Sequence, residues 1–333
     1  MRLTSLAAGF LTLALAGIPA GNAVGEPHGN GGFPQSQDKS AQGQEPLKTQ
    51  VTVVNVFVTL RDKHHAIVSD LSQKDFKILE DGQEQKVAFF TKEVEMPITL
   101  GILMDTSGSM DRILPAEQDA ASRFVKRVLR KNDEAMVISF DFDVTLLADF
   151  TQDTSVLERA IRKTVMNAPP AGIGGTAGTI PYSSGGTNLY DAVYLAAHDE
   201  LATEAGRKAV ILLTDAEDTG SRLKISDAIE AAQRADAVIH VLLIRDFMAT
   251  SGVGPSVASK MASETGGRVI DVHNEKTLEK AFDEISEELR SQYVLGYYPT
   301  NEKRDGSFRK IQVEVDQPDV KVLARKGYYA PRR

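Results

Sequence analysis

The 333-residue sequence contains no cysteine and no tryptophan. Without cysteine the chain has no disulfide bond, no thiolate metal ligand, no cysteine nucleophile and no acylated lipoprotein cysteine. After residue 23, no stretch approaches the roughly 18 consecutive apolar residues that indicate a membrane-spanning helix. Basic residues are outnumbered by acidic ones, with 38 Lys and Arg against 46 Asp and Glu, which leaves a formal net charge of −8. This balance disfavours non-specific binding to nucleic acid.

The first 23 residues have the pattern of a secretory signal peptide. Arg2 is a short basic start, residues 6–18 form an apolar run too short to span a bilayer, and Gly21 and Ala23 are small residues before a cleavage site. An N-terminal membrane anchor is the alternative interpretation. We therefore expect export to the periplasm or the cell exterior, with a fold held together by its core alone.

Two β-rich segments flank the centre of the chain. Residues 24–46 are rich in Gly, Pro, Gln and Ser and predict a disordered tether. Alternating apolar residues and a hairpin signal at Asp81-Gly82 predict strands within 47–96, and residues 292–333 again predict strands. Each segment is too small to be stable alone, so we expect the two to combine into one small β-sandwich.

Residues 97–291 alternate apolar strands with amphipathic helices. Six strands and the helices between them predict a doubly wound, mostly parallel α/β sheet flanked by helices. Because domain termini are often close together, this α/β domain can be inserted between the two halves of the sandwich.

Polar side chains occur at the predicted carboxyl ends of the parallel strands. Residues 105–109 (DTSGS) follow the first strand, residues 184–187 (SGGT) precede a helix, and an aspartate ends an apolar strand. Ligands of open α/β sheets bind beyond these strand ends. Two carboxylates and three hydroxyls there would favour Mg²⁺, or alternatively Mn²⁺ or Ca²⁺. The candidate metal ligands are Asp105, Ser107, Ser109, Thr187 and Asp215.

The Asp-x-Ser-x-Ser segment, the Gly-Gly-Thr segment and the aspartate at a strand end resemble the von Willebrand factor A domain and its metal-ion-dependent adhesion site. All five candidate ligands match in residue type and order, and the resemblance covers about residues 97–291. Residues 75–82, 296–298 and 325–331 are similar to a bacterial family of exported proteins that carry a von Willebrand factor A-related domain. With these flanks the resemblance extends over nearly all of 47–331.

The resemblance implies a protein that binds other proteins through its metal, in adhesion or in scaffolding of an envelope assembly. Ser107, Ser109 and Thr187 would bind the cation directly, Asp105 and Asp215 largely through water, and an Asp or Glu of a partner would complete the coordination. We therefore expect no enzymatic activity. A metal-assisted hydrolase of the cell envelope and a module with a purely structural metal remain the alternatives.

Simpler explanations exist for several of these residues. Ser109 and Thr187 could cap the helices that follow them. Residues 141–145 (DFDVT) resemble a phosphatase nucleophile motif, but their place between the second and third strands favours a turn with solvated Asp141 and Asp143. His240 lies in an apolar strand and is expected to be a hydrogen-bonded core residue. The glycine-rich segment 171–186 is either a loop beside the metal or a passive connection.

Overall fold

The computed structural model describes residues 53–92, 96–165, 186–244 and 253–332. The predicted signal peptide, the predicted tether and residues 171–185 of the glycine-rich segment lie outside these ranges. All described residues belong to one compact unit, and the domain boundaries predicted at 96/97 and 291/292 stay predictions. No helix in the described part of the chain is long and apolar enough to cross a membrane.

The α/β part is built on one six-stranded sheet with the order β10-β9-β8-β5-β6-β7. Neighbouring strands are parallel except for the edge strand β7, which runs antiparallel to β6. The predicted fold class, a mostly parallel six-stranded sheet flanked by helices, is confirmed. The strands are β5 (Ile98–Asp105), β6 (Glu134–Phe140), β7 (Val144–Thr151), β8 (Arg207–Thr214), β9 (Ala237–Ile244) and β10 (Val269–Val272).

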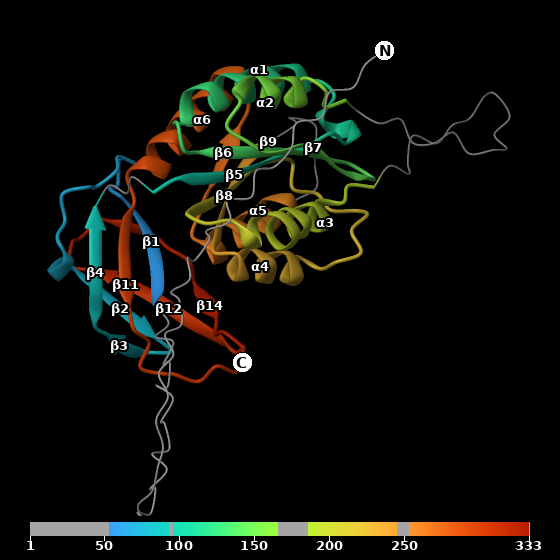
Figure 1. Cartoon of the computed structure of the whole chain (residues 1–333). Helices are drawn as coiled ribbons and strands as arrows, with labels where there is room; N and C mark the ends of the chain where they lie inside the picture. Colours follow the sequence, from blue (N-terminus) through green and yellow to red (C-terminus); the bar gives the residue numbers. More distant parts are fainter. Residues whose placement is uncertain (1–52, 93–95, 166–185, 245–252, 333) are drawn as a thin grey trace, which may run out of the picture. The chain divides into compact units, whose positions relative to one another are not determined.

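Helices cover both faces of this sheet (Figure 1). The central strand β5 is buried along its whole length, and its alternate residues contribute to the two cores. Leu100, Ile102 and Met104 pack into the core under α1, α2 and α6, while Leu103 packs into the core under α3, α4 and α5. The helices are α1 (Leu114–Val128), α2 (Thr154–Ile161), α3 (Leu189–Tyr194, continued by a π-helical turn at Leu195–Glu200), α4 (Ile225–Arg234), α5 (Gly254–Thr265) and α6 (Glu275–Arg290).

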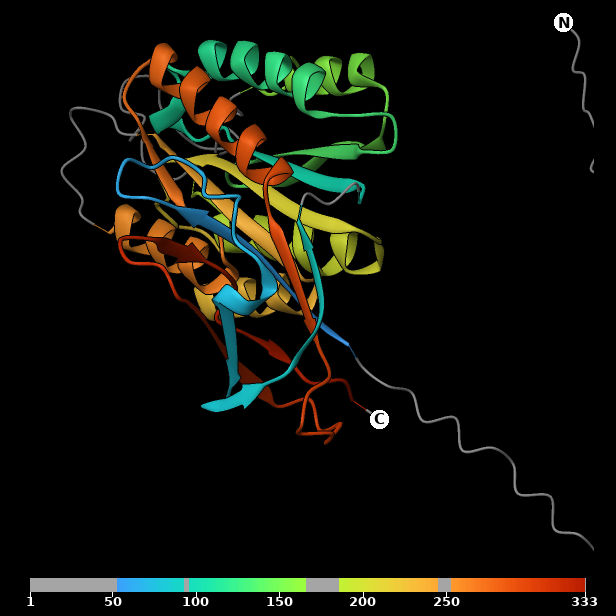
Figure 2. The ribbon, with the colours of Figure 1, turned by 90° about the vertical axis from the view of Figure 1, so that its left-hand side faces the viewer.

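Strands from both ends of the described chain form two four-stranded sheets, β13-β1-β11-β4 and β14-β12-β2-β3. Figure 2 shows β1 in blue beside β11 in orange, and these two strands pair antiparallel. One hydrophobic core contains residues of both sheets, as the predicted β-sandwich requires. The strands are β1 (Val54–Arg61), β2 (Phe76–Glu80), β3 (Gln83–Gln85), β4 (Val87–Lys92), β11 (Tyr293–Tyr297), β12 (Phe308–Val315), β13 (Lys321–Leu323) and β14 (Gly327–Tyr329).

A buried polar cluster lies inside the sandwich. The hydroxyls of Tyr297 and Tyr328 donate to Glu80 Oε2 at 2.7 and 3.0 Å, and the Arg309 guanidinium lies 3.5 Å from Glu80 Oε1. Burial and the neighbouring Glu80 raise the pKa of Tyr328 to about 12, so its hydroxyl stays a donor at neutral pH. These tyrosines therefore have a packing role, whereas Tyr298 is 46% exposed.

The sandwich and the α/β part are joined by a buried ion-pair network at α6. Glu288 Oε2 accepts from Arg61 of β1 at 3.0 Å and from Arg268 at 2.7 Å. Burial alone would raise the pKa of Glu288, but the cationic side chains of Arg268 and Arg61 help to hold it below its ordinary value. Because α6 is followed within three residues by β11, this network fixes the helix where the chain enters the sandwich.

His240 lies next to this network and differs from its prediction. It is fully buried in β9, but neither ring nitrogen has a hydrogen-bond partner within the described residues, so the expected hydrogen bond is wrong. Burial lowers the pKa of His240, which favours a neutral ring in the core.

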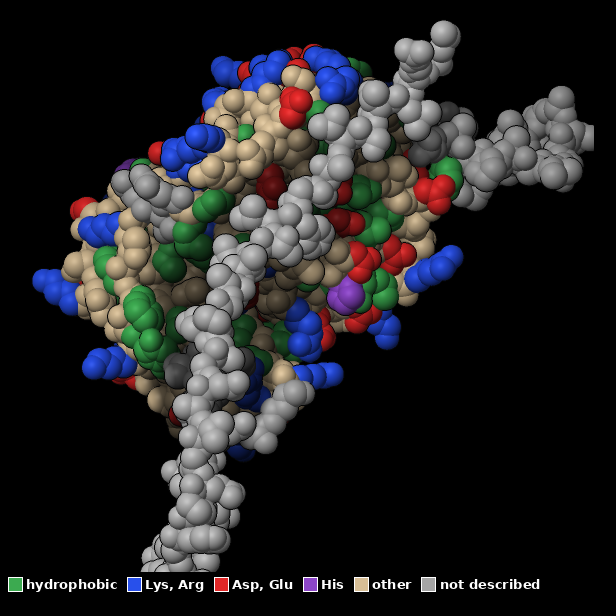
Figure 3. All heavy atoms as spheres, in the orientation of Figure 1, with side chains coloured by type: hydrophobic (Ala, Val, Ile, Leu, Met, Phe, Trp, Pro, Cys, Tyr) green, Lys and Arg blue, Asp and Glu red, His purple; other side chains and the backbone are tan. Residues whose placement is uncertain are grey.

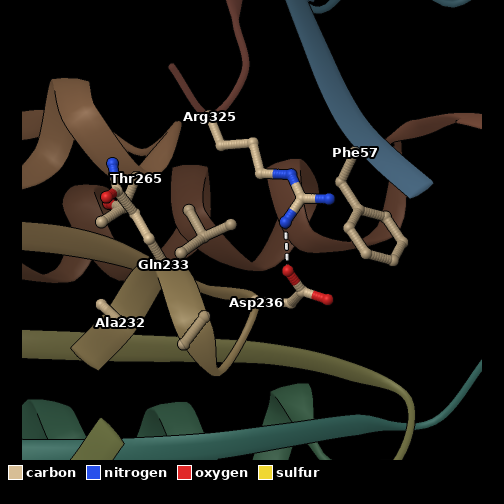
Figure 4. Close-up of a pocket in the computed structure, with 8 residues that line it drawn as sticks. Phe57, Ala232, Gln233, Asp236, Thr265 and Arg325 are labelled. Carbon is tan, nitrogen blue, oxygen red and sulfur yellow. Dashed lines mark hydrogen bonds and ion pairs between the residues drawn. The ribbon is translucent and has the colours of Figure 1, made fainter. Parts of the chain in front are cut away.

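A small hollow lies at a second contact between the two parts (Figure 4). An ion pair joins Arg325 to Asp236 at its wall, and Arg325 Nη2 also donates to the Asn55 carbonyl at 2.6 Å. The hollow adjoins Ala237 at the start of β9. It therefore lies at the amino ends of the parallel strands, away from the predicted metal ligands.

Glu288→Gln should lower the free energy of unfolding by about 3 kcal/mol, because it leaves the buried Arg61 without a carboxylate partner and removes one of the two carboxylates that pair with the partly buried Arg268. The matched control is Asp283→Asn on the same helix, since Asp283 pairs with Arg127 at an exposed position. The control should change stability by less than about 1 kcal/mol. Urea unfolding followed by circular dichroism measures both, and equal small losses would contradict a stabilising role for the network.

Candidate metal site

Asp105 is the buried end of the central strand β5. Its Oδ1 accepts from the Ser107 backbone N–H at 2.9 Å, and its Oδ2 accepts from the Thr214 hydroxyl at 2.5 Å. Thr214 is the last residue of β8, which is parallel to β5, so this contact joins two neighbouring strand ends. The contact places the Asp105 carboxylate beside the chain that continues into Asp215.

Ser107 and Ser109 follow in the turn between β5 and α1. Their hydroxyl oxygens lie 3.0 Å apart, and Ser107 is 8% exposed while Ser109 is exposed. The helix-cap explanation is wrong for Ser109 and Thr187, because α1 begins after Ile113 and α3 begins after Asn188. Their hydroxyls are therefore not committed to helix caps.

Asp215 and Thr187 reach the same edge by different contacts. Asp215 Oδ1 accepts from the Glu217 backbone N–H at 3.0 Å, and its charge acts on Asp105. Thr187 is joined to the loop after Asp215 by its backbone, since its carbonyl accepts from the N–H groups of Thr219 and Gly220, both at 3.1 Å. The structure thus links Asp105, Ser107 and Ser109 by direct hydrogen bonds and brings Thr187 and Asp215 to the same strand ends.

The two loops that carry Thr187 and Asp215 approach closely, which explains a glycine in the Gly-Gly-Thr segment. A Cβ added at Gly186 would lie 3.0 Å from the Gly220 Cα. Ser184 and Gly185 of that segment lie outside the described residues.

Residues 141–143 form a turn between β6 and β7, as expected, and residues 144 and 145 begin β7. Asp141, however, is not solvated. It is 3% exposed, accepts from the Thr106 hydroxyl at 3.1 Å and accepts from the Asp143 backbone N–H at 3.0 Å. The expectation of a solvated Asp141 is therefore wrong, because this side chain organises the turn from inside. Asp143 is exposed, as predicted.

One acidic side chain at this edge was not among the residues predicted from the sequence. Glu117 in the first turn of α1 is fully buried, and its pKa is raised well above the ordinary value by burial and by the charges of Asp105 and Asp215. A signal for it exists, because Glu117 is spaced by four and seven residues from Ala121 and Phe124 on the apolar face of the helix.

The site has an excess of negative charge. Burial raises the pKa of Asp105 to about 7, with Asp215 adding to the rise and the bonds from Ser107 and Thr214 opposing it. Burial and Asp215 also raise the pKa of Glu217. Figure 3 shows acidic side chains gathered on this face of the α/β part, near the region of α3. The charged groups that raise the pKa values of Asp105, Glu117 and Glu217 are all carboxylates.

This donor set fits a hard divalent cation. Buried carboxylates with hydroxyl neighbours and no basic counter-charge are the chemistry that Mg²⁺ and related ions neutralise. Within the described ranges, no group of three or more His, Cys, Asp and Glu side chains is arranged to hold a metal ion. A cation here would therefore depend on hydroxyls and water as much as on carboxylates.

The raised pKa of Asp105 predicts a pH dependence of the metal-free protein. The pKa of Asp105 is near 3.8 in the unfolded chain and about 7 in the folded protein. At a pH between these two values, the folded protein holds a proton on Asp105 that the unfolded chain releases. The free energy of unfolding should therefore fall as pH rises through this window, by up to about 4 kcal/mol.

Urea unfolding at a series of pH values in the presence of a chelator measures this slope. Asp105→Asn should remove that share of it, and excess Mg²⁺ should also reduce it because a cation favours the carboxylate. Identical slopes for the native protein and Asp105→Asn would contradict the assignment to this group.

Comparison with known proteins bears on the α/β part. The family model described as von Willebrand factor type A domain matches residues 100–217, which include all five candidate ligands. A comparison with curated proteins finds no match.

Solved structures with a similar fold are distant in sequence. The von Willebrand factor domain of the type V pili tip protein Mfa5 from Porphyromonas gingivalis is 15% identical, with 59% of this chain and 96% of that chain covered and a TM-score of 0.45. A von Willebrand factor type A structure from Catenulispora acidiphila is 14% identical, with 77% and 73% covered and a TM-score of 0.47. Proximal thread matrix protein 1 from the mussel byssus, with a zinc-occupied MIDAS motif, is 14% identical, with 63% and 49% covered and a TM-score of 0.48.

Likenesses at these identities and TM-scores do not extend a neighbour's function to this chain. The family match and the six-stranded sheet with helices on both faces agree with the resemblance in residues 105–215. Over residues 100–217 the chain matches the von Willebrand factor type A domain.

Proposed function

We propose that this chain is an exported protein-binding module that uses a divalent cation at the ends of β5 and β8 to capture an acidic side chain of a partner protein. The observation that carries the proposal is the buried Asp105, which has hydroxyl and amide donors but no basic side chain among the groups that shift its pKa most. A buried carboxylate in this state lacks a positive counter-charge.

In this proposal the five predicted residues have two different roles at the cation. Ser107, Ser109 and Thr187 supply neutral oxygens, and Asp105 and Asp215 supply the charge that retains the cation. A bound Mg²⁺ would act as a Lewis acid with an open position for an external carboxylate. Neutral hydroxyl ligands suit this role, because they leave more of the positive charge of the ion available to the partner.

The proposal includes no catalysed reaction. Support for adhesion or scaffolding comes from the family match, and support for export to the periplasm or the cell exterior comes from the signal-peptide pattern in the sequence. In this proposal the partner is a protein that presents Asp or Glu, and neither nucleic acid nor a membrane span takes part.

Titration calorimetry of Mg²⁺ and Mn²⁺ into chelator-stripped protein tests the metal site. The native protein should bind saturably, and Asp105→Ala combined with Ser107→Ala should weaken binding by at least about tenfold. Asp149→Asn, which removes an exposed acid of β7 outside the site, should bind like the native protein.

A panel of immobilised peptides tests the second half of the proposal. Peptides with one Asp or Glu should retain the native protein in Mg²⁺ and release it in chelator, while matched Asn or Gln peptides should not retain it. Retention that persists in chelator and in the double variant would contradict a metal-bridged contact.

A further inference from the structure

Glu117 is an exception among the buried carboxylates of the described chain. It is 0% exposed, and neither of its carboxylate oxygens has a hydrogen-bond partner within the described residues. The other buried acids all accept hydrogen bonds from hydroxyls, backbone N–H groups or arginines. They are Glu80, Asp105, Asp133, Asp141 and Glu288.

A carboxyl group in this position has to be neutralised, either by holding its proton or by a cation beside it. Removing a charged group from water without a partner costs several kcal/mol, and proteins normally offset this with a cation or with hydrogen bonds. Glu288 and Asp133 each face arginines. Glu117 has no ion pair with an arginine or lysine within the described residues, and the charges of Asp105 and Asp215 add to the effect of burial in raising its pKa.

The position of Glu117 is set by rigid elements. It lies in the first turn of α1, directly after the turn that carries Ser107 and Ser109, and its backbone N–H donates to the Ile113 carbonyl at 3.0 Å. Ala120, Ala121 and Phe124 of the same helix are packed in the core. The helix therefore holds the carboxylate at the end of β5 rather than letting it turn to solvent.

We propose that Glu117 is a third carboxylate of the cation site, in addition to the five residues of the adhesion-site pattern, and that it strengthens the binding of a divalent cation. The inference rests on the metal site of the proposed function. No three acidic side chains of the described chain converge as metal ligands. Glu117 therefore acts through its charge, or through a bridging water, rather than as a further direct ligand.

Glu117→Gln tests this, because glutamine has nearly the same shape and lacks the charge. Calorimetry with Mn²⁺ and Mg²⁺ should show binding about tenfold to a hundredfold weaker than in the native protein. Glu117→Asp keeps the charge and should stay closer to native affinity. Ser122→Ala, another buried side chain of α1 whose hydroxyl has no hydrogen-bond partner in the described residues, is the matched control and should bind like the native protein.

Thermal unfolding separates this role from a purely structural one. In chelator, Glu117→Gln should melt near the native temperature, because glutamine keeps the shape of a protonated carboxyl group that has no hydrogen-bond partner there. Saturating Mg²⁺ should raise the melting temperature of the native protein more than that of the variant. A shift of the same sign and size with and without metal would mean that Glu117 only packs.

The two proposals fail in different ways. If the native protein binds neither ion, the metal site of the proposed function is wrong and the role of Glu117 falls with it. If the native protein binds and Glu117→Gln binds within about twofold of it, the inference about Glu117 is overturned while the metal site stands.

Discussion

The hydrogen bond from the Thr214 hydroxyl to Asp105 Oδ2 joins the carboxyl ends of two parallel strands, and the site is arranged around it. β5 is an inner strand between β6 and β8, and its last side chain, Asp105, is fully buried. A carboxylate in that position needs donors and a counter-charge. The donors are present as a hydroxyl and an amide, and the surrounding charged groups are acids. The proposed cation site is based on this one buried group.

The sandwich meets the α/β part away from that site. Its contacts are a buried glutamate shared by two arginines at α6 and an ion pair beside the start of β9. The glutamate lies on α6, the last helix, and the ion pair lies at the amino ends of the parallel strands. Neither contact involves the carboxyl ends of the strands, where the candidate ligands lie. The candidate ligands therefore lie in the loops after β5 and β8 and in the segment before α3, and the sandwich contacts the α/β part at other places.

Long, strongly patterned elements were predictable and short or buried polar features were not. The six strands of the sheet and the Asp81-Gly82 hairpin follow from apolar alternation and turn chemistry, and the turn has positive φ at both residues. β3 and β14 have three residues each, too few for a period to be visible. His240 and Asp141 were misjudged in opposite directions, because hydrogen bonding and exposure depend on neighbours that are distant in sequence.

By itself the sequence determined the fold class and the order of the five candidate ligands, since strand and helix periods and turn residues are local properties of the chain. Only the tertiary structure decided which polar groups lack a partner. Glu117 and Glu288 are both glutamates on the buried side of amphipathic helices, and nothing local distinguishes them. The packing of α6 against β1 brings Arg61 to Glu288, whereas the packing of α1 at the end of β5 brings Asp105 and Asp215 to Glu117. Electrostatic energy depends on distance in space, and the chain order does not contain that distance.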